Sequence, residues 1–418
     1  RYWNPAPPGE PVDWIREDEL DQFDELLDQA VGRGLALGPA GIFLSGGLDS
    51  VSVAATAVDR ARREGSPPPL ALSLVFPTLE ANEETVQRGV AEGLGLAHVL
   101  LDFEDAAGTR GLLTPALEIS AGLPSPLLNV WFPAYRTLTA EGASRGCRVI
   151  LTGGGGDEWL TVSPFLAADR MRSADVRGLA SLWSMMNRSY RLSRLATLRS
   201  VLWTFGGKPL VAAGAERYAP SALAMYRRRQ KRRLTPAWIA PDPALRRDIF
   251  DRAAASVLPT TEAGFYLREG QLSLDHSLIS MEMEELHETG LRTGVPVRMP
   301  FWDAQLVDFL YRTPPELLNE GGRAKGLVRQ MLARKFPELG FERHRKVLAT
   351  NYFTEVMARE VPGVWRKLGG APALESLGIV DGTQLQSAVR EVFERNQHQG
   401  VSRIWNLLTV EAWVRSHL

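Results

Sequence analysis

The sequence predicts an α/β fold, in which a parallel sheet with flanking helices is followed by a mostly helical C-terminal region. Three observations support this prediction. Short apolar runs alternate with helical segments over the first 165 residues or so, a glycine-rich turn follows the first and the fourth run, and the alternation stops after about Pro164. Strands separated by helices favour a parallel sheet that is covered on both faces.

The apolar runs are short enough to be buried strands. They lie at Ile42–Leu44, Leu70–Phe76, His98–Phe103 and Arg148–Thr152. Ligands of such sheets bind at the carboxyl ends of the strands. Both glycine-rich turns of this chain lie at such ends, so we expect the functional site there.

Helical segments separate these runs, at Val51–Glu64, Glu83–Leu94 and Val130–Arg145. A further helix is expected over Glu17–Arg33. Its apolar residues recur at helical spacing and are Leu20, Phe23, Leu26 and Leu27. We therefore divide the chain into an N-terminal lead-in and helix (1–40), an α/β core (41–165) and a mostly helical region (166–418).

The composition is that of a soluble globular protein, with 44% hydrophobic and 23% charged residues in a chain of 418. The net charge of −1 argues against a nucleic-acid-binding polycation. The single cysteine, Cys147, excludes a disulfide framework and a cysteine zinc site within the chain. No apolar stretch is long enough for a membrane span and no secretory signal is present, so a cytoplasmic protein is expected. The chain begins at Arg1 without Met, which is compatible with the trailing part of a longer product.

The first glycine-rich turn is the most informative stretch. It follows the apolar run that ends at Leu44 and consists of Ser45, Gly46, Gly47, Leu48, Asp49 and Ser50. A strand, a glycine turn and a helix together present free backbone N–H groups and the positive end of a helix dipole to a phosphate group. A carboxylate beside a phosphate suggests an intervening cation. The turn therefore predicts a nucleotide polyphosphate held with Mg²⁺.

This turn lacks the Gly-Lys-Ser/Thr of a Walker loop and the glycine spacing of a dinucleotide fingerprint. It resembles the pyrophosphate loop of the PP-loop ATP pyrophosphatases. By that resemblance the protein would cleave ATP between the α and β phosphates and leave an adenylated substrate. An ordinary glycine-rich turn without a ligand is the alternative interpretation.

The second glycine-rich turn, Thr152–Glu158, ends the fourth run and contains four consecutive glycines. Such a permissive turn costs backbone entropy, so it usually has a function. Asp157 would face Asp49 if the two strands are neighbours. Two converging carboxylates could then hold Mg²⁺ against the triphosphate. A flexible loop with solvated acids is the alternative.

Together the motifs resemble the synthetase domain of the asparagine synthetase family, over essentially the whole chain. They are, in order, Ser45–Ser50, Thr152–Glu158, Val295–Asp303 and Lys346. The resemblance implies that Asp49 and Asp157 bind magnesium and that Lys346 neutralises charge at the transferring phosphoryl group. It also implies that the first loop binds ATP, helped by Gly153 and Gly154. Phe76, after the second strand, would lie where the family holds adenine mainly by backbone contacts.

Two departures from the family pattern bear on the substrate. The N-terminal glutaminase domain with its terminal cysteine nucleophile is missing, so this chain would not release ammonia from glutamine. Gly154 stands where asparagine synthetases have Glu. The loss of this carboxylate puts aspartate in doubt as the substrate and is expected to open the pocket for a larger one.

Two further segments, Asp275–Gly290 and Pro300–Leu310, resemble the actinobacterial lasso peptide cyclases, which are macrolactam synthetases. Such enzymes adenylate an Asp or Glu side chain of a precursor (core) peptide, and the N-terminal amine of that peptide then closes the ring. The resemblance implies a leader peptidase and a leader-recognition protein as partners, and a role in antibiotic biosynthesis.

A general base would help by keeping the attacking amine neutral. The Tyr/Glu pair of the related β-lactam synthetases is not preserved, because a Gly occupies the tyrosine position. Glu284 and Glu285 are the candidates for the base, together with Glu282, although a solvent-exposed acidic helix face explains each of them equally well. His287 is expected to be structural.

A basic segment interleaved with aromatic residues runs from Arg170 to Arg233. Its composition fits a nucleic-acid footprint. Its arginines alternate with apolar residues at helical spacing, which favours amphipathic helices with a solvated basic face. These apolar residues are Leu179, Leu182, Met186, Leu192, Leu195 and Leu198. We expect this segment to dock a precursor peptide or a partner protein, and we expect no nucleic acid as a partner.

Four functions are therefore compared. The first is an AMP-forming amide ligase that closes a peptide macrolactam. The second is an asparagine synthetase or β-lactam synthetase relative that acts on a small amino acid. The third is a tRNA-modifying PP-loop enzyme or RNA-binding protein, and the fourth is an inactive scaffold within a biosynthetic complex.

Overall fold

The computed structural model describes residues 11–418 except 191–192, 256–263, 275, 346, 348 and 396–397. Lys346 and Asp275 therefore lie outside the described residues. Among the described residues, none of the helices combines the length and the apolar composition needed to cross a membrane.

The centre of the fold is a parallel sheet of five strands. They are β1 (Ala40–Phe43), β2 (Leu70–Val75), β3 (His98–Asp102), β4 (Val149–Leu151) and β5 (Val297–Arg298). Their order in the sheet is β3-β2-β1-β4-β5, and every neighbouring pair is parallel. This confirms the predicted α/β class with flanking helices. The order reverses between β1 and β4, which is where sheets of this kind bind ligands.

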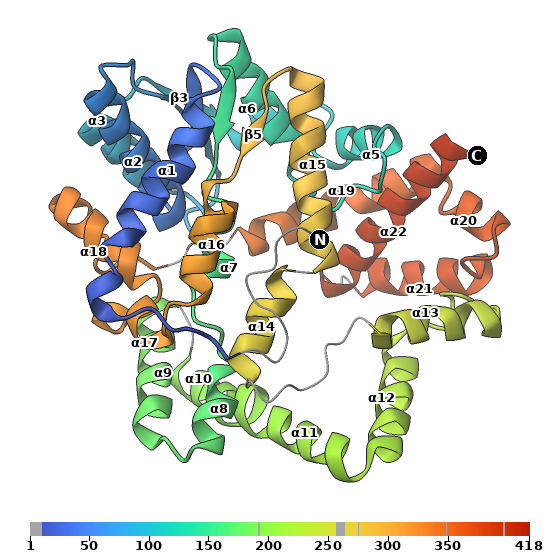
Figure 1. Cartoon of the computed structure of the whole chain (residues 1–418). Helices are drawn as coiled ribbons and strands as arrows, with labels where there is room; N and C mark the ends of the chain where they lie inside the picture. Colours follow the sequence, from blue (N-terminus) through green and yellow to red (C-terminus); the bar gives the residue numbers. More distant parts are fainter. Residues whose placement is uncertain are drawn as a thin grey trace.

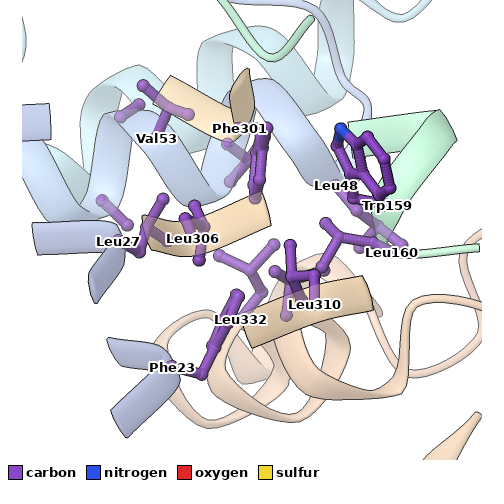
Figure 2. Close-up of a cluster of buried hydrophobic side chains, with 14 of the residues drawn as sticks. Phe23, Leu27, Leu48, Val53, Trp159, Leu160, Phe301, Leu306, Leu310 and Leu332 are labelled. Atoms are coloured by element: carbon purple, nitrogen blue, oxygen red, sulfur yellow. The ribbon is translucent and has the colours of Figure 1, made fainter. Parts of the chain in front are cut away.

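Helices cover both faces of the sheet, and strand residues alternate between the two cores. Ile42 belongs to one core and its neighbour Phe43 to the other. On the first face lie α1 (Gln22–Leu35), α2 (Leu48–Glu64), α3 (Glu84–Leu94), α16 (Ala304–Tyr311) and α18 (Gly326–Lys335). Figure 2 shows part of this core, with Leu27 of α1, Val53 of α2 and Leu306 of α16 among its labelled side chains. On the second face lie α5 (Leu113–Ala121), α6 (Phe132–Ser144), α19 (Thr350–Leu368) and α22 (His398–His417).

Two predicted helix boundaries were wrong, and two short helices were not predicted. The helix expected from Val51 begins at Leu48, so Asp49 and Ser50 belong to its first turn. The helix expected over Glu17–Arg33 is a 3-10 turn (Glu17–Glu19) followed by α1. Between β3 and α6 the chain also forms α4 (Phe103–Ala107) and α5. These differences arise because hydrophobic period locates an element, whereas hydrogen bonding at its ends sets the boundary.

The C-terminal region is mostly helical, as expected, but it also supplies β5. A short helix, α7 (Gly156–Trp159), follows β4 within the α/β core. The other helices of the C-terminal region are α8 (Leu166–Arg172), α9 (Val176–Ser189), α10 (Arg194–Arg199), a π-helix (Ser200–Gly207), α11 (Lys208–Tyr218), α12 (Pro220–Leu234), α13 (Pro243–Ala255), α14 (Phe265–Leu274), α15 (Ser277–Thr293), α17 (Pro315–Leu318), α20 (Pro372–Ser376) and α21 (Gly382–Glu394), with 3-10 turns at Pro300–Trp302, Glu320–Gly322 and Pro337–Leu339. In Figure 1, α11 and α12 run along one edge of the molecule toward α13.

The basic segment is only partly amphipathic. In α9, Leu182 and Met186 are buried, as the spacing predicts. In α10, Leu195 and Leu198 are exposed, which contradicts the prediction. Helices α11 and α12 bury none of their residues. The basic and apolar side chains of this edge therefore face solvent together.

Candidate active site

The two glycine-rich loops meet at the edge of the sheet where the strand order reverses. Strands β1 and β4 pair directly, with Ile42 opposite Leu151, so the loops after them emerge side by side. Gly156 packs against the first loop so closely that a Cβ atom would lie 2.7 Å from the Cβ of Asp49. Gly155, with φ of 95°, adopts the left-handed conformation that starts α7. The glycines thus allow Asp157 to approach the first loop.

The first loop is held in shape by its own hydroxyl groups. Ser45 N donates to Ser50 Oγ over 3.2 Å, Gly47 N donates to Ser45 Oγ over 3.2 Å, and the two hydroxyls lie 2.8 Å apart. Leu48 begins α2, and no side chain caps this helix at Gly47. The loop therefore surrounds the positive end of α2, a geometry that suits a phosphate group.

Asp49 and Asp157 converge on one cationic group, the ammonium of Lys325. Lys325 Nζ donates to Asp49 Oδ2 and, over 2.8 Å, to Asp157 Oδ1. No cluster of three or more metal-ligating His, Cys, Asp or Glu side chains occurs among the described residues. Two carboxylates nevertheless fit Mg²⁺, which is usually bound by one or two carboxylates together with substrate phosphates and waters. The Lys325 ammonium lies between these two carboxylates, at a position that suits a cation.

Lys325 was not recognised in the sequence. Its backbone is left-handed, with φ of 63°, which is uncommon for a residue other than glycine and occurs mainly at functional sites. Burial would lower the pKa of its ammonium, but the charges of Asp49 and Asp157 outweigh this effect and the pKa is raised. The only sequence signal is a lysine among glycines at the start of a helix, between Gly322 and Gly326.

The segment that carries Lys346 is attached to the same end of α18. Arg329, buried in α18, donates to the carbonyl oxygens of Phe341 over 2.5 Å and of His344 over 3.1 Å. His344 and Val347 line the same cavity as Lys325 and Asp49. Lys346 itself lies outside the described residues, so its role stays a prediction.

A cavity of about 640 Å³ opens over the loops, within the size range of small-molecule and cofactor sites. Ser45, Asp49 and Lys325 form its polar floor, and aromatic residues form much of its wall. These are Phe76, Trp131, Tyr135, Phe353 and Trp405. A second cavity of about 290 Å³ shares several of these residues, among them Ser45 and Phe76, and also includes Leu44, Gly153 and Gly154. The predicted nucleotide-contacting residues thus gather around two adjoining cavities.

Phe76 lines both cavities and also belongs to an aromatic cluster. Its ring stacks on Phe103 with a centroid distance of 4.8 Å and meets Phe353 edge-on at 5.9 Å. Aromatic packing of this kind fixes the end of β2. The position of Phe76 is compatible with the predicted backbone contacts to adenine, which stay a prediction.

The three candidate bases on α15 differ in their surroundings, since Glu282 and Glu285 line the second cavity and Glu284 does not. Glu285 is buried and accepts hydrogen bonds from Leu128 N and, over 2.7 Å, from Asn129 Nδ2. Burial raises its pKa, while these hydrogen bonds oppose the rise. Glu284 is exposed and lines a separate cavity with Leu123 and His287. Glu285 lines the second cavity with its carboxylate held by Leu128 and Asn129, whereas Glu284 lies outside both cavities that adjoin the loops.

Glu282 also lines the second cavity, together with Asp49 and Gly154. Partial burial of its carboxyl group in this cleft raises its pKa. A carboxylate with a raised pKa beside a reacting site is suited to proton transfer. Glu282 and Glu285 thus both line the cavity beside the loops, and Glu284 does not.

The space beside Gly154 differs from the expectation. A Cβ atom on Gly154 would lie 2.9 Å from the sulfur of Met299 and 3.1 Å from Thr152 Oγ1. The prediction of an opened pocket at this position was therefore wrong, because the Met299 side chain occupies the space. Met299 and Gly154 together line the second cavity, so the missing Glu is replaced by an apolar wall.

Glu83 is a second residue that the sequence did not reveal. It precedes α3, and its carboxylate accepts a hydrogen bond of 3.2 Å from Gly46 N in the first loop. Burial raises the pKa of this carboxyl group to about 7, and the Gly46 N–H acts in the opposite direction. A buried acid thus sits against the predicted phosphate-binding loop.

The fold and the site together define an α/β protein whose two glycine-rich loops meet at the point where the order of a parallel sheet reverses. The chain belongs to the asparagine synthase family, whose family model matches residues 22–415. That membership places it among the ATP-dependent carbon–nitrogen ligases, which generally use ATP with Mg²⁺.

Two other comparisons add little. No curated protein matches this chain. Among solved structures, the chain is similar to the U34-tRNA thiolase NcsA from Methanococcus maripaludis, determined with its [4Fe-4S] cluster. The identity is 15%, with 54% of this chain and 85% of the thiolase covered, and the TM-score is 0.25.

Proposed function

We propose that this protein is an AMP-forming amide ligase that closes a peptide macrolactam. It would adenylate an Asp or Glu side chain of a precursor peptide and join it to the N-terminal amine of the same peptide. The observation that carries the proposal is the placement of Asp49, Asp157 and Lys325 on the floor of an aromatic-walled cavity of about 640 Å³. The acids and the ammonium suit phosphate chemistry, and the wall suits a peptide.

The first chemical step is adenylation. A carboxylate oxygen of the peptide attacks the α-phosphorus of ATP, and pyrophosphate leaves. The amides of the Ser45–Ser50 loop would bind the leaving phosphates, and Asp49 and Asp157 would hold Mg²⁺, which would shield the phosphate charges. Lys325, and by the family resemblance Lys346, would stabilise the negative charge that develops.

The second step forms the amide bond. The neutral amine attacks the acyl carbon, AMP leaves as a stable anion, and the amine gives up one proton. Glu282 is placed to accept this proton, because it faces the loops and its pKa is raised. The apolar wall made by Trp131, Phe353 and Trp405 would exclude water, which would otherwise hydrolyse the adenylate.

The partners follow from the same proposal. A precursor peptide requires a leader-recognition protein and a leader peptidase, and the solvent-exposed basic edge of α11 and α12 offers a docking surface for one of these proteins. Such a biosynthetic complex would work in the cytoplasm, where ATP is available, and would serve antibiotic biosynthesis.

The experiment is incubation of the protein with ATP, Mg²⁺ and linear peptides that carry an acid at the ring position. We expect a peptide product lighter by one water, with AMP and pyrophosphate formed in equal amounts. Asp49→Ala should abolish turnover. The matched control is Asp59→Asn on the same helix, whose carboxylate pairs with Lys335 on the surface and which should remain active.

Other results would support other functions. ADP formation, or turnover without a peptide, would contradict the proposal. Pyrophosphate release with free amino acids would favour a small-acid ligase related to the asparagine and β-lactam synthetases. Salt-sensitive retention of tRNA would favour an RNA-directed enzyme that uses the basic face of α12.

A further inference from the structure

One backbone N–H group of the first loop donates a hydrogen bond to a side chain from outside the loop, that of Glu83. Gly46 N donates to Glu83 Oε2 over 3.2 Å, whereas the N–H groups of Ser45 and Gly47 donate to hydroxyls of the loop itself. The contact is close, because a Cβ atom on Gly46 would lie 2.9 Å from the Cβ of Glu83. The Glu83 side chain therefore lies directly on the loop.

The Glu83 carboxylate contacts the loop in the way that a bound anion would, by accepting a hydrogen bond from the Gly46 N–H. A glycine loop before a helix binds phosphate through its backbone N–H groups and the helix dipole. A carboxylate uses the same donors and carries the same sign of charge. Because like charges a few ångströms apart in a partly dry site repel strongly, a triphosphate and an ionised Glu83 cannot share Gly46 N–H.

We infer that the Glu83 carboxylate occupies the position at which the loop would bind pyrophosphate. A nucleotide therefore has to displace this carboxylate when it binds. The inference rests on the proposed function, since it adds a regulator to the ATP loop. It makes Glu83 a positioning residue that keeps the empty loop ordered and sets the affinity of the loop for phosphates.

The surroundings of Glu83 permit this exchange. Its side chain is only 16% exposed, and His344 Nε2 lies 3.9 Å from Glu83 Oε1. The other ionisable groups that line the same cavity are Asp49 from α2, Tyr135 from α6, Asp157 from α7, Tyr190 after α9, Lys325 at the start of α18 and Arg329 within α18. His344 therefore lies near enough to be a polar partner for the displaced carboxyl group. The buried carboxyl group also has a raised pKa, so protonation assists its release near neutral pH.

The test is the affinity of the full chain for inorganic pyrophosphate and for ATP, measured calorimetrically at fixed Mg²⁺. Glu83→Gln retains a hydrogen-bond acceptor for Gly46 but removes the charge. At pH 8 we expect this variant to bind pyrophosphate about tenfold more tightly than the parent chain, since even 1.4 kcal/mol of removed repulsion gives that factor. At pH 6 the ratio should fall toward one, because Glu83 is then largely protonated in the parent chain.

The matched control is Glu84→Gln, the next residue, whose carboxylate points to Arg88 over 2.7 Å and which should leave both affinities unchanged. Circular dichroism checks folding, and Glu83→Ala serves as a second variant without any acceptor. Equal affinities of the parent chain and both Glu83 variants at pH 8, or weaker binding by the variants, would overturn the inference while ATP binding itself stands. If neither the parent chain nor the variants bind ATP, the proposed function fails and the inference fails with it.

Discussion

Lys325 Nζ lies 2.8 Å from Asp157 Oδ1 and also donates to Asp49, so one ammonium joins the two glycine loops. The side chain of Lys325 is only 11% exposed. The carboxylates of Asp49 and Asp157 stabilise its buried positive charge. A buried charge pair loses much more when one partner is removed than it contributes as a pair. The cluster of Asp49, Asp157 and Lys325 therefore has a structural role, in addition to the catalytic role that we propose for it.

Replacement of Lys325 by Met should separate these two roles. We expect AMP formation to fall by about 100-fold or more, as when one preorganised charge-stabilising group is lost. The melting temperature should fall in the absence of metal, and Mg²⁺ should restore more of it in the variant than in the parent chain, because the freed acids gain a cation. Calorimetry with and without Mg²⁺ measures this difference.

The control for this variant is Lys335→Met on the same helix, whose ammonium pairs with Asp59 near the surface. It should change neither turnover nor the metal dependence of the melting temperature. An equal response of both variants to Mg²⁺ would show that Asp49 and Asp157 are not the cation site.

The close approach of the two loops predicts a strong effect of Gly156→Ala. The added Cβ would lie 2.7 Å from the Asp49 Cβ, so Asp49 or the loop has to move. We expect pyrophosphate release to fall by at least about tenfold, because catalytic groups tolerate little displacement. Gly214→Ala in α11 is the control, since nothing lies within 4 Å of its added Cβ. Undiminished pyrophosphate release by Gly156→Ala would contradict the loop geometry.

The raised pKa of Glu83 predicts a pH-dependent stability. Because the pKa in the folded chain, about 7, lies above the ordinary value of 4.5, the protonated form favours folding. This contribution is fully present below pH 4.5 and is lost as the pH rises through 7. At about 1.4 kcal/mol per pKa unit, it amounts to roughly 3 kcal/mol at most.

Glu83→Gln cannot ionise and should not lose this contribution. Its free energy of unfolding relative to the parent chain should therefore increase between pH 5 and pH 8, which urea titrations at both values measure. The same difference at both pH values would mean that Glu83 titrates normally in the folded protein.

The acids of α15 give a further prediction. Glu282→Gln should lower the rate of ring closure by about 10²-fold or more and remove the basic group from the pH–rate profile. Glu284→Gln should have little effect, since its side chain lies outside the cavities that adjoin the loops. The sequence left Glu282, Glu284 and Glu285 open as the base, so a comparison of these two variants decides between Glu282 and Glu284.

The sequence was sufficient for the parts of the site that follow local pattern. The four longer strands and the two loops could be located because apolar runs and glycines mark them, and the convergence of Asp49 and Asp157 follows once β1 and β4 are neighbours. Lys325 could not be found in this way. It lies 276 residues from Asp49, and its left-handed backbone belongs to no period or motif. Glu83 was missed because a carboxylate at a helix start is usually solvated.

Strand β5 and Lys325 also have a consequence for the order in which the protein is assembled. During synthesis the first four strands leave the ribosome long before Val297 and Arg298 are available to pair with β4. Until α18 follows, Asp49 and Asp157 lack the ammonium of Lys325 between them. Such late, long-range contacts slow folding and expose a sheet edge in the meantime. The nascent chain therefore acquires its catalytic edge last, and a fragment that ends near residue 165 should remain aggregation-prone.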